Sequence, residues 1–303
     1  MVPVLTLDEY LRRWQHWGLR VDDREEALRF ISVVSPFRLK GYLSPFIRQR
    51  QDGTRYIRDG FTFARLLDLY NFDRELRLVV LHMLERIEIA VRAQLVQQVC
   101  ESCGDTWYLD EAIYRRTPTN PDAGRQLIAQ IGREIDRSSD QFVTNHRRRH
   151  GAAHPLPAWK AIEILSFGTV SRIYQQLDRP GERKRIAEAF GLGSSRVLAN
   201  WIHVCAAVRN IAAHHARLYN RRLVILPLKR ETRRSSPWLQ YPVADNHWPK
   251  LYVALSIMQF LLAEVSPGNR FGQRFRWLAD DYPGVDFRHM GFHPRWREEP
   301  LWQ

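Results

Sequence analysis

The chain has few of the residues that build cross-linked, fibrous or disordered proteins. Its 303 residues include only 3 cysteines, 16 glycines and 16 prolines, whereas 45% are hydrophobic. Three cysteines cannot form a disulfide framework, which favours a reducing compartment such as the cytoplasm. The low glycine and proline contents exclude collagen-like and long low-complexity stretches. We therefore expect a cytoplasmic globular protein.

A long uninterrupted hydrophobic run is also missing. The most apolar segment, residues 251–265, contains Ser256, Gln259 and Glu264 and is too short to span a bilayer. Asp8 and Glu9 stand where a secretory signal would carry basic and then apolar residues. No membrane partner is expected.

Acidic residues are outnumbered. The chain has 33 Asp and Glu against 46 Lys and Arg, which gives a net charge of +13. An excess of this size favours a nucleic acid as partner. The alternative is a basic surface that serves solubility alone.

One cysteine pair has the spacing of a metal or redox motif. Cys100 and Cys103 are separated by two residues, but the sequence contains no second pair and no βαβ pattern around them. A helix that ends before Gly104 explains the pair better.

Three histidines have a spacing of four, which would place them on one helical face as metal ligands. His146, His150 and His154 show it, but Gly151 and Pro155 make a continuous helix improbable there. No metal and no cofactor is expected.

Helical periodicity dominates, and no internal repeat is visible. Apolar residues recur every three or four positions, which predicts a mainly α fold in a single domain, 1–303. We expect N-terminal helices within 1–60, a core at about 62–265 and an irregular tail over 266–303. The expected helices are 5–17, 26–34, one that begins after Thr62, 72–99, 124–138, 141–150, 158–177, 182–190, 196–219 and 251–265, with a short extended piece at 223–228.

The most informative stretch lies near the end of the helix expected over 196–219. Arg209 is followed by Asn210, and the pair His214 and His215 begins four residues later. A permanent cation can neutralise a developing phosphoryl charge, and an imidazole can move protons near neutral pH. These four residues are the candidate catalytic set for metal-independent cleavage of a phosphodiester. The alternative is a structural role, with His215 in phase with the core.

Helical phase suggests that two chains share the site. On a straight helix Arg209 and His214 diverge by about 140°. Two copies that meet at a two-fold axis would bring both residues of each chain into one cleft, so a homodimer or higher homo-oligomer is expected. The polar side of the same helix carries Asn210, His214, Arg217 and Arg221.

The helix over 72–99 carries charged residues beside its buried stripe. Glu85, Glu88 and Arg92 have spacings that permit pairing with one another, or the acids orient an arginine elsewhere. Both readings stay open, and we regard the three as supporting residues of the site.

Further basic residues are candidates for RNA contacts. Arg147, Arg148 and Arg149 form a run that either binds phosphates or is a solvated face. Arg38 and Tyr42, on a turn-like segment, either line a binding cleft or pack the first helices on the core. Arg217 and Arg221 belong to the same RNA-binding set, and weaker candidates are Arg183, Lys184, Arg185, Lys229, Arg230, Arg233 and Arg234.

Several segments, in order, resemble the Abi-like bacterial family of AbiD/AbiF-type abortive-infection proteins. The signature runs from Arg209 to Asn220, as Arg-Asn-x-x-Ala-His-His-x-Arg-Leu-Tyr-Asn. The other segments are 37–42, 70–77, 84–92, 157–159, 163–169, 290–292 and 300–302. The resemblance covers about residues 35–302. Two stretches depart from the family pattern, 146–150 and 292–296, and neither includes the candidate catalytic set.

The resemblance implies a HEPN-type helical fold. Its ribonucleases carry an arginine, a polar residue and a histidine four to six positions on, which correspond here to Arg209, Asn210 and His214, with His215 also inside the window. It further implies a role in antiphage defence or as a toxin, held in check by a small RNA.

The expected reaction is transesterification. His214 would act as general base on a ribose 2′-OH or as general acid on the leaving 5′-oxygen. Arg209 would bind the phosphate, and Asn210 would orient either His214 or the phosphate. RNA would be cut and DNA spared. The competing hypothesis is a catalytically silent RNA-binding or scaffolding protein of the same fold.

Overall fold

The computed structural model describes residues 5–116, 118–230 and 238–303, and its fold is mainly α, as expected. In chain order the helices are α1 (Leu7–His16), α2 (Arg24–Val34), α3 (Pro36–Leu43), α4 (Phe63–Cys103), α5 (Ala123–Arg137), α6 (Gln141–His150), α7 (Ala158–Ile164), α8 (Phe167–Gln176), α9 (Pro180–Ala189), α10 (Ser195–Ala213), α11 (Leu251–Val265) and α12 (Phe271–Asp281). A small antiparallel hairpin pairs β1 (Ile47–Gln49) with β2 (Arg55–Ile57).

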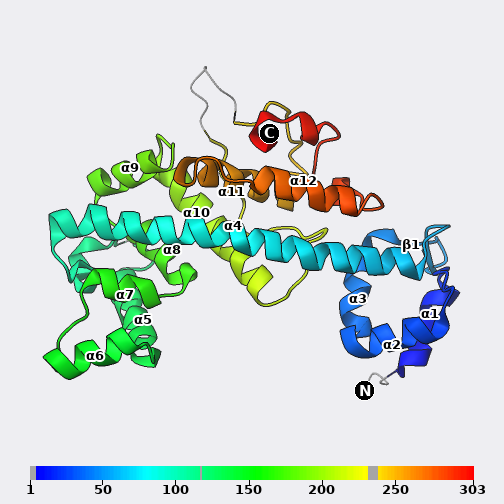
Figure 1. Cartoon of the computed structure of the whole chain (residues 1–303), viewed down its shortest axis with the longest axis horizontal. Helices are drawn as coiled ribbons and strands as arrows, with labels where there is room; N and C mark the ends of the chain where they lie inside the picture. The colour runs from blue at the N-terminus through cyan, green and yellow to red at the C-terminus, as the bar shows by residue number, and fades with distance from the viewer. Residues whose placement is uncertain (1–4, 117, 231–237) are drawn as a thin grey trace.

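Helix α4 is the axis of the molecule. Its 41 residues extend over about 60 Å, from the cap at Thr62, whose side chain accepts from the Arg65 N–H, to Gly104. The N-terminal helices and the hairpin lie at one end of α4, and α5, α6 and α7 lie near the other (Figure 1). Helices α10, α11 and α12 pack along its middle.

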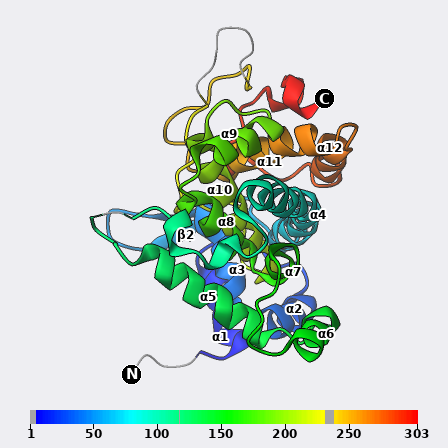
Figure 2. The ribbon, with the colours of Figure 1, turned by 90° about the vertical axis from the view of Figure 1, so that its left-hand side faces the viewer.

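The core forms where α10 and α11 meet α4 and α8. Helix α11 is buried over most of its length, which explains its continuous apolar sequence. Viewed along α4, α10 and α11 lie beside it and α5 and α8 lie on the adjoining side (Figure 2). The side of α10 that faces this core includes Trp201, Val204 and Val208, all buried.

Five expected features of this chain differ from the structure. The segments expected after Thr62 and over 72–99 form the single helix α4. The helix expected over 158–177 is interrupted after Ile164, because the Ser166 side chain caps a new helix by accepting from the Thr169 N–H. The tail is not irregular throughout, since it contains α12 and short 3-10 turns. Residues 223–228 form no strand; an isolated bridge joins Arg222 to Lys250.

The fifth difference concerns the segment of Arg38 and Tyr42. It is the helix α3 rather than a turn, capped by Ser35 and with Pro36 in its first turn. Tyr42 is buried on the core side and Arg38 is exposed.

None of the helices in the described part of the chain is both long and apolar enough to cross a membrane.

Candidate active site

Helix α10 ends earlier than its periodicity indicates. The last helical residue is Ala213, and His214 is the C-cap. The backbone of His215 has a φ of 56°, in the left-handed region. The expected helix over 196–219 is therefore wrong beyond residue 213, and the helical phase assigned to His214, His215, Arg217 and Arg221 does not apply.

The chain reverses at this point through a Schellman arrangement. The His215 N–H donates to the Ala212 carbonyl at 3.0 Å, and the Ala216 N–H donates to the Ile211 carbonyl at 2.9 Å. Glycine usually occupies the left-handed position, but histidine is among the residues that tolerate it. As a result, His215 is exposed and does not face the core. His214 is exposed as well. Within the described residues, neither side chain has a hydrogen-bond partner.

Two helices, α3 and α4, hold the turn that follows α10, residues 214–219. Asp73 of α4 is completely buried, and its Oδ1 accepts from the backbone N–H of Leu218 at 2.9 Å and of Tyr219 at 2.6 Å. Its other oxygen accepts from the Tyr42 hydroxyl at 2.6 Å and from Arg77. The turn is thus fixed from α3 and α4.

Burial governs the protonation of this cluster. Burial raises the pKa of Asp73 above its ordinary value, although the donors around that carboxyl act in the opposite direction. Burial and the neighbouring Asp73 also raise the pKa of Tyr42, which keeps its hydroxyl a donor. A buried carboxyl with this many donors is a rigid anchor for the backbone.

Two of the predicted RNA-binding residues help to hold the same turn. The Arg38 guanidinium donates to the carbonyl of His215. Arg217 donates to the carbonyl of Tyr219 at 2.6 Å and lies over the Tyr42 ring. Gly41 permits this approach, because a Cβ there would lie 3.1 Å from the Arg217 Nε. Burial lowers the pKa of Arg217.

Arg221 and Asn210 complete this region. Arg221 donates to the Arg217 carbonyl at 3.1 Å. Asn210 is exposed, and in the described part of the chain its side chain has no hydrogen-bond partner.

Arg209 lies apart from this turn, against α4. Its Nε is 3.6 Å from Glu88 Oε2, and its side chain is 38% exposed against 14% for Glu88. Glu88 in turn pairs with Arg92. Arg92 is buried and donates to the carbonyls of Ile162 and Leu165, at the junction of α7 and α8. Glu88 thus combines the two roles considered in the sequence analysis. It pairs with Arg92 along α4, and it contacts Arg209 of α10.

A pocket of about 340 Å³ is lined in part by the ion-paired residues Glu88, Arg92 and Arg209. Its lining includes three carboxylates, of Glu85, Glu88 and Glu163, and two guanidiniums, of Arg92 and Arg209. Glu85 is exposed and forms no ion pair within the described residues. In the same part of the chain, the terminal nitrogens of Arg209 have no hydrogen-bond partner.

The basic run of α6 lies elsewhere. Arg147 pairs with Asp136 at 2.8 Å, and Arg148 donates to the Asn145 side chain at 3.1 Å. Arg149 is exposed, and within the described residues it has no hydrogen-bond or ion-pair partner. Helix α6 lies at the periphery, apart from α10 in both views (Figures 1 and 2).

The weaker candidates are mostly engaged. Arg183 is buried beneath Tyr174. Lys184 and Arg185 pair with neighbouring glutamates of α9, and Lys229 pairs with Asp245. Arg230 lies over the Phe260 ring. Arg233 and Arg234 lie outside the described residues.

The three spaced histidines form a cluster in which every pair of rings is close, and the centroids of His146 and His154 are 5.6 Å apart. The ring centroids of His146 and His150 are 4.7 Å apart, and those of His150 and His154 are 5.3 Å apart. His146 also contacts the carbonyl of Pro155 at 3.1 Å. Among the described residues, no group of three or more His, Cys, Asp or Glu is arranged to hold a metal ion.

The structure therefore divides the candidate residues into two groups. Arg209 joins Glu88, Arg92 and Glu85 at the α4 pocket, whereas Arg38, Tyr42, Arg217 and Arg221 surround the turn that presents His214 and His215. Reasoning from sequence gave no role to Asp73, Arg77 or Glu163. For Asp73 a signal existed, because an aspartate in phase with the apolar stripe of a helix must find donors.

Comparison with known proteins supports the segments noted in the sequence up to residue 220, and the segments 290–292 and 300–302 lie outside the match. The family model described as Abi-like protein matches residues 29–220. This range includes α3, α4, α10 and the turn after α10. No curated protein and no solved structure matches the chain significantly.

Proposed function

Because this chain belongs to the Abi-like family, we propose that it acts in abortive infection, and that it does so as a metal-independent endoribonuclease of the HEPN type. The observation that carries the proposal is the end of α10. It presents two exposed imidazoles whose backbone is anchored from the core, five residues after an arginine whose terminal nitrogens are unengaged within the described part of the chain.

Arg209 is the phosphate-binding group in this proposal. Glu88 contacts it through Nε, so the two terminal nitrogens can donate to two phosphate oxygens. Glu88 and Arg92 are positioning residues, which fix the guanidinium before RNA arrives. A preorganised cation stabilises the developing charge on the phosphoryl oxygens without reorganisation.

His214 moves the protons. As general base it removes the 2′-OH proton, and the 2′-oxygen attacks the adjacent phosphorus. The bond from phosphorus to the 5′-oxygen breaks, and an imidazolium gives a proton to that oxygen. The products are a 2′,3′-cyclic phosphate and a 5′-OH. His215, exposed on the same turn, is the second candidate for either proton transfer.

A second copy of the chain completes the site in this proposal. Arg209 faces the α4 pocket, whereas the two histidines project from the turn beyond the helix. A two-fold axis near the end of α10 would place the arginine of one protomer close to the histidines of its partner. RNA is the proposed substrate, and control by a small RNA is part of the same proposal.

A cleavage assay in EDTA tests the proposal. Wild-type protein should cut single-stranded RNA and leave the same DNA sequence intact, and His214→Ala should lose about 100-fold or more of the rate. His203→Ala, a substitution on the same helix, is the matched control and should retain activity. Full activity of His214→Ala together with loss of activity in His215→Ala would move the role to His215. Absence of RNA cleavage by correctly folded wild-type protein, with RNA still bound, would favour a silent RNA-binding protein.

A further inference from the structure

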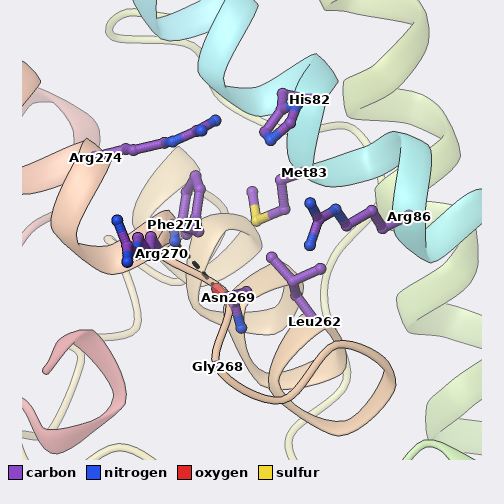
Figure 3. Close-up of a pocket in the computed structure, with 9 residues that line it drawn as sticks. All are labelled: His82, Met83, Arg86, Leu262, Gly268, Asn269, Arg270, Phe271 and Arg274. Carbon is purple, nitrogen blue, oxygen red and sulfur yellow. Dashed lines mark hydrogen bonds between the residues drawn. The ribbon is translucent and has the colours of Figure 1, made fainter.

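A second pocket lies on another side of α4, away from the proposed catalytic residues. It has a volume of about 240 Å³ and is formed by α4, the end of α11 and the beginning of α12 (Figure 3). Its lining residues are His82, Met83, Arg86, Leu262, Gly268, Asn269, Arg270, Phe271 and Arg274.

The pocket carries positive charge only. Three arginines and one histidine line it, and its lining includes no carboxylate. Arg274 extends toward His82, and Arg86 extends toward the same space from the opposite side (Figure 3). Within the described residues, these arginines form no ion pair, and Arg86 donates only to the Ser266 hydroxyl, at 2.8 Å. Cations gathered without a counterion favour an anion between them.

The wall of the pocket is built by local hydrogen bonds. Asn269 accepts from the Phe271 N–H at 3.1 Å and donates to the Ser266 carbonyl at 3.2 Å, which fixes the turn between α11 and α12. Gly268, in this turn, has a φ of 75°, which glycine adopts without strain. Behind the cations, Met83, Leu262 and Phe271 are each less than 5% exposed and form an apolar floor.

Helix α4 thus separates two kinds of charge. Glu85 and Arg86 are adjacent in sequence and about 100° apart around the helix. Glu85 lines the pocket that contains Arg209, with three carboxylates against two guanidiniums, whereas Arg86 lines the wholly basic one. The charged lining on the Arg86 side is therefore only basic, whereas that on the Arg209 side is mixed.

We propose that this basic pocket binds the phosphoryl group of a nucleotide or of an RNA strand. Guanidiniums donate in a fork that matches two phosphoryl oxygens, and a terminal phosphate carries up to about two negative charges, which several arginines compensate better than one. The apolar floor keeps water from the inner side of the anion and strengthens these contacts. Binding in this pocket does not depend on RNA cleavage, so it can be tested separately from the proposed ribonuclease activity.

Isothermal titration calorimetry on the full chain tests this site. The probes are inorganic pyrophosphate, adenosine 5′-monophosphate and a short 5′-phosphorylated oligoribonucleotide whose 2′-oxygens are methylated so that the proposed reaction cannot cut it, with adenosine as the uncharged control. Arg274→Gln should weaken binding of each phosphorylated probe about tenfold, and Arg270→Gln with Arg274→Gln should weaken it further. Arg276→Gln removes the same charge from α12 outside the pocket and should bind as the wild type does.

The outcomes separate cleanly. Tighter binding of the monophosphate than of the oligomer identifies a nucleotide as ligand, and the reverse order identifies an RNA strand; either supports a phosphoryl site here when Arg274→Gln weakens that binding. Equal binding by wild type, Arg274→Gln and Arg276→Gln would overturn it, as would tight binding of adenosine. Arg86→Gln, which changes α4 instead of α12, provides a second test if an α12 variant does not fold.

Discussion

Replacing Asp73 by asparagine removes one negative charge from the most enclosed polar cluster near the proposed site. In the native protein both carboxyl oxygens accept hydrogen bonds, from two backbone N–H groups of the turn, from Tyr42 and from Arg77. An asparagine can keep the bonds to Leu218 and Tyr219 through its oxygen. Its amide nitrogen then faces the Tyr42 hydroxyl, which can turn to accept from it, and the Arg77 guanidinium, which can only donate and so loses its partner.

The energetic cost follows from the burial of Arg77, which is 6% exposed. A buried cation that loses its partner costs about 3–5 kcal/mol of folding free energy. Unfolding entropy is about 2.1 cal/mol/K per residue, which for 303 residues gives about 0.6 kcal/mol/K. Asp73→Asn should therefore lower the Tm by about 5–8 °C.

The assay is thermal unfolding followed by circular dichroism, with Asp68→Asn as matched control. Asp68 is exposed on α4, one turn before Asp73, and its replacement should change stability by no more than about 0.5 kcal/mol. At a temperature where both variants are folded, Asp73→Asn should also cleave RNA more slowly, since the turn that carries His214 is less firmly held. An unchanged Tm for Asp73→Asn would refute the reasoning that this carboxyl is the anchor.

Three further predictions concern the arginine, the assembly and pH. Glu88→Gln should lower the cleavage rate about tenfold because Arg209 loses its orientation, whereas Glu101→Gln, at an exposed position near the end of the same helix, should leave it unchanged; equal rates in both variants would remove the positioning role. Mixing inactive Arg209→Ala and His214→Ala proteins should restore part of the activity if two chains share a site, and a mixture as inactive as its components would exclude a shared site. Burial lowers the pKa of His289, which accepts from or donates to the Tyr219 hydroxyl at 2.6 Å. The folded state thus disfavours protonated His289, so the contribution of neutral His289 to stability is present above the unfolded pKa of about 6.5 and is lost as the pH falls below it. His289→Asn should therefore show a smaller loss of Tm between pH 7 and pH 5 than the wild type does.

Much of the fold could be predicted from apolar periodicity. Helices α2, α5, α6 and α11 lie within a few residues of their expected positions, because each has a regular stripe or a clear cap. The sequence predicted two segments where the structure has the single helix α4, in which Asp73 is buried. The Asp73 carboxyl is satisfied by Arg77 of the same helix and by groups from α3 and from the turn after α10, and no local pattern reports the distant donors.

The candidate site shows the same limit more sharply. The residue types at the end of α10 pointed to phosphodiester chemistry, but their periodicity predicted a helix through residue 219. The helix ends at Ala213 because His215 adopts a left-handed conformation and Asp73 captures the following backbone. Sequence phase consequently assigned His215 to the core, whereas it is exposed.

The sequence predicted only part of the contact between Glu88 and Arg209. Acidic residues beside a buried stripe in a basic protein suggested a role toward an arginine, but which arginine depends on how α10 crosses α4. The structure supplies that crossing, and with it the chain of contacts from Arg92 through Glu88 to Arg209.

The chemical identity of the RNA ends tests the central claim most directly. Cleavage by wild-type protein in EDTA, with the products analysed by mass spectrometry, should yield fragments with a 2′,3′-cyclic phosphate or 3′-phosphate on one side and a 5′-OH on the other. Replacing the ribose at a mapped cleavage position by 2′-deoxyribose should stop cleavage there. Fragments with a 5′-phosphate and a 3′-OH, or continued cleavage at the deoxy position, would contradict a mechanism in which the 2′-oxygen attacks the phosphorus.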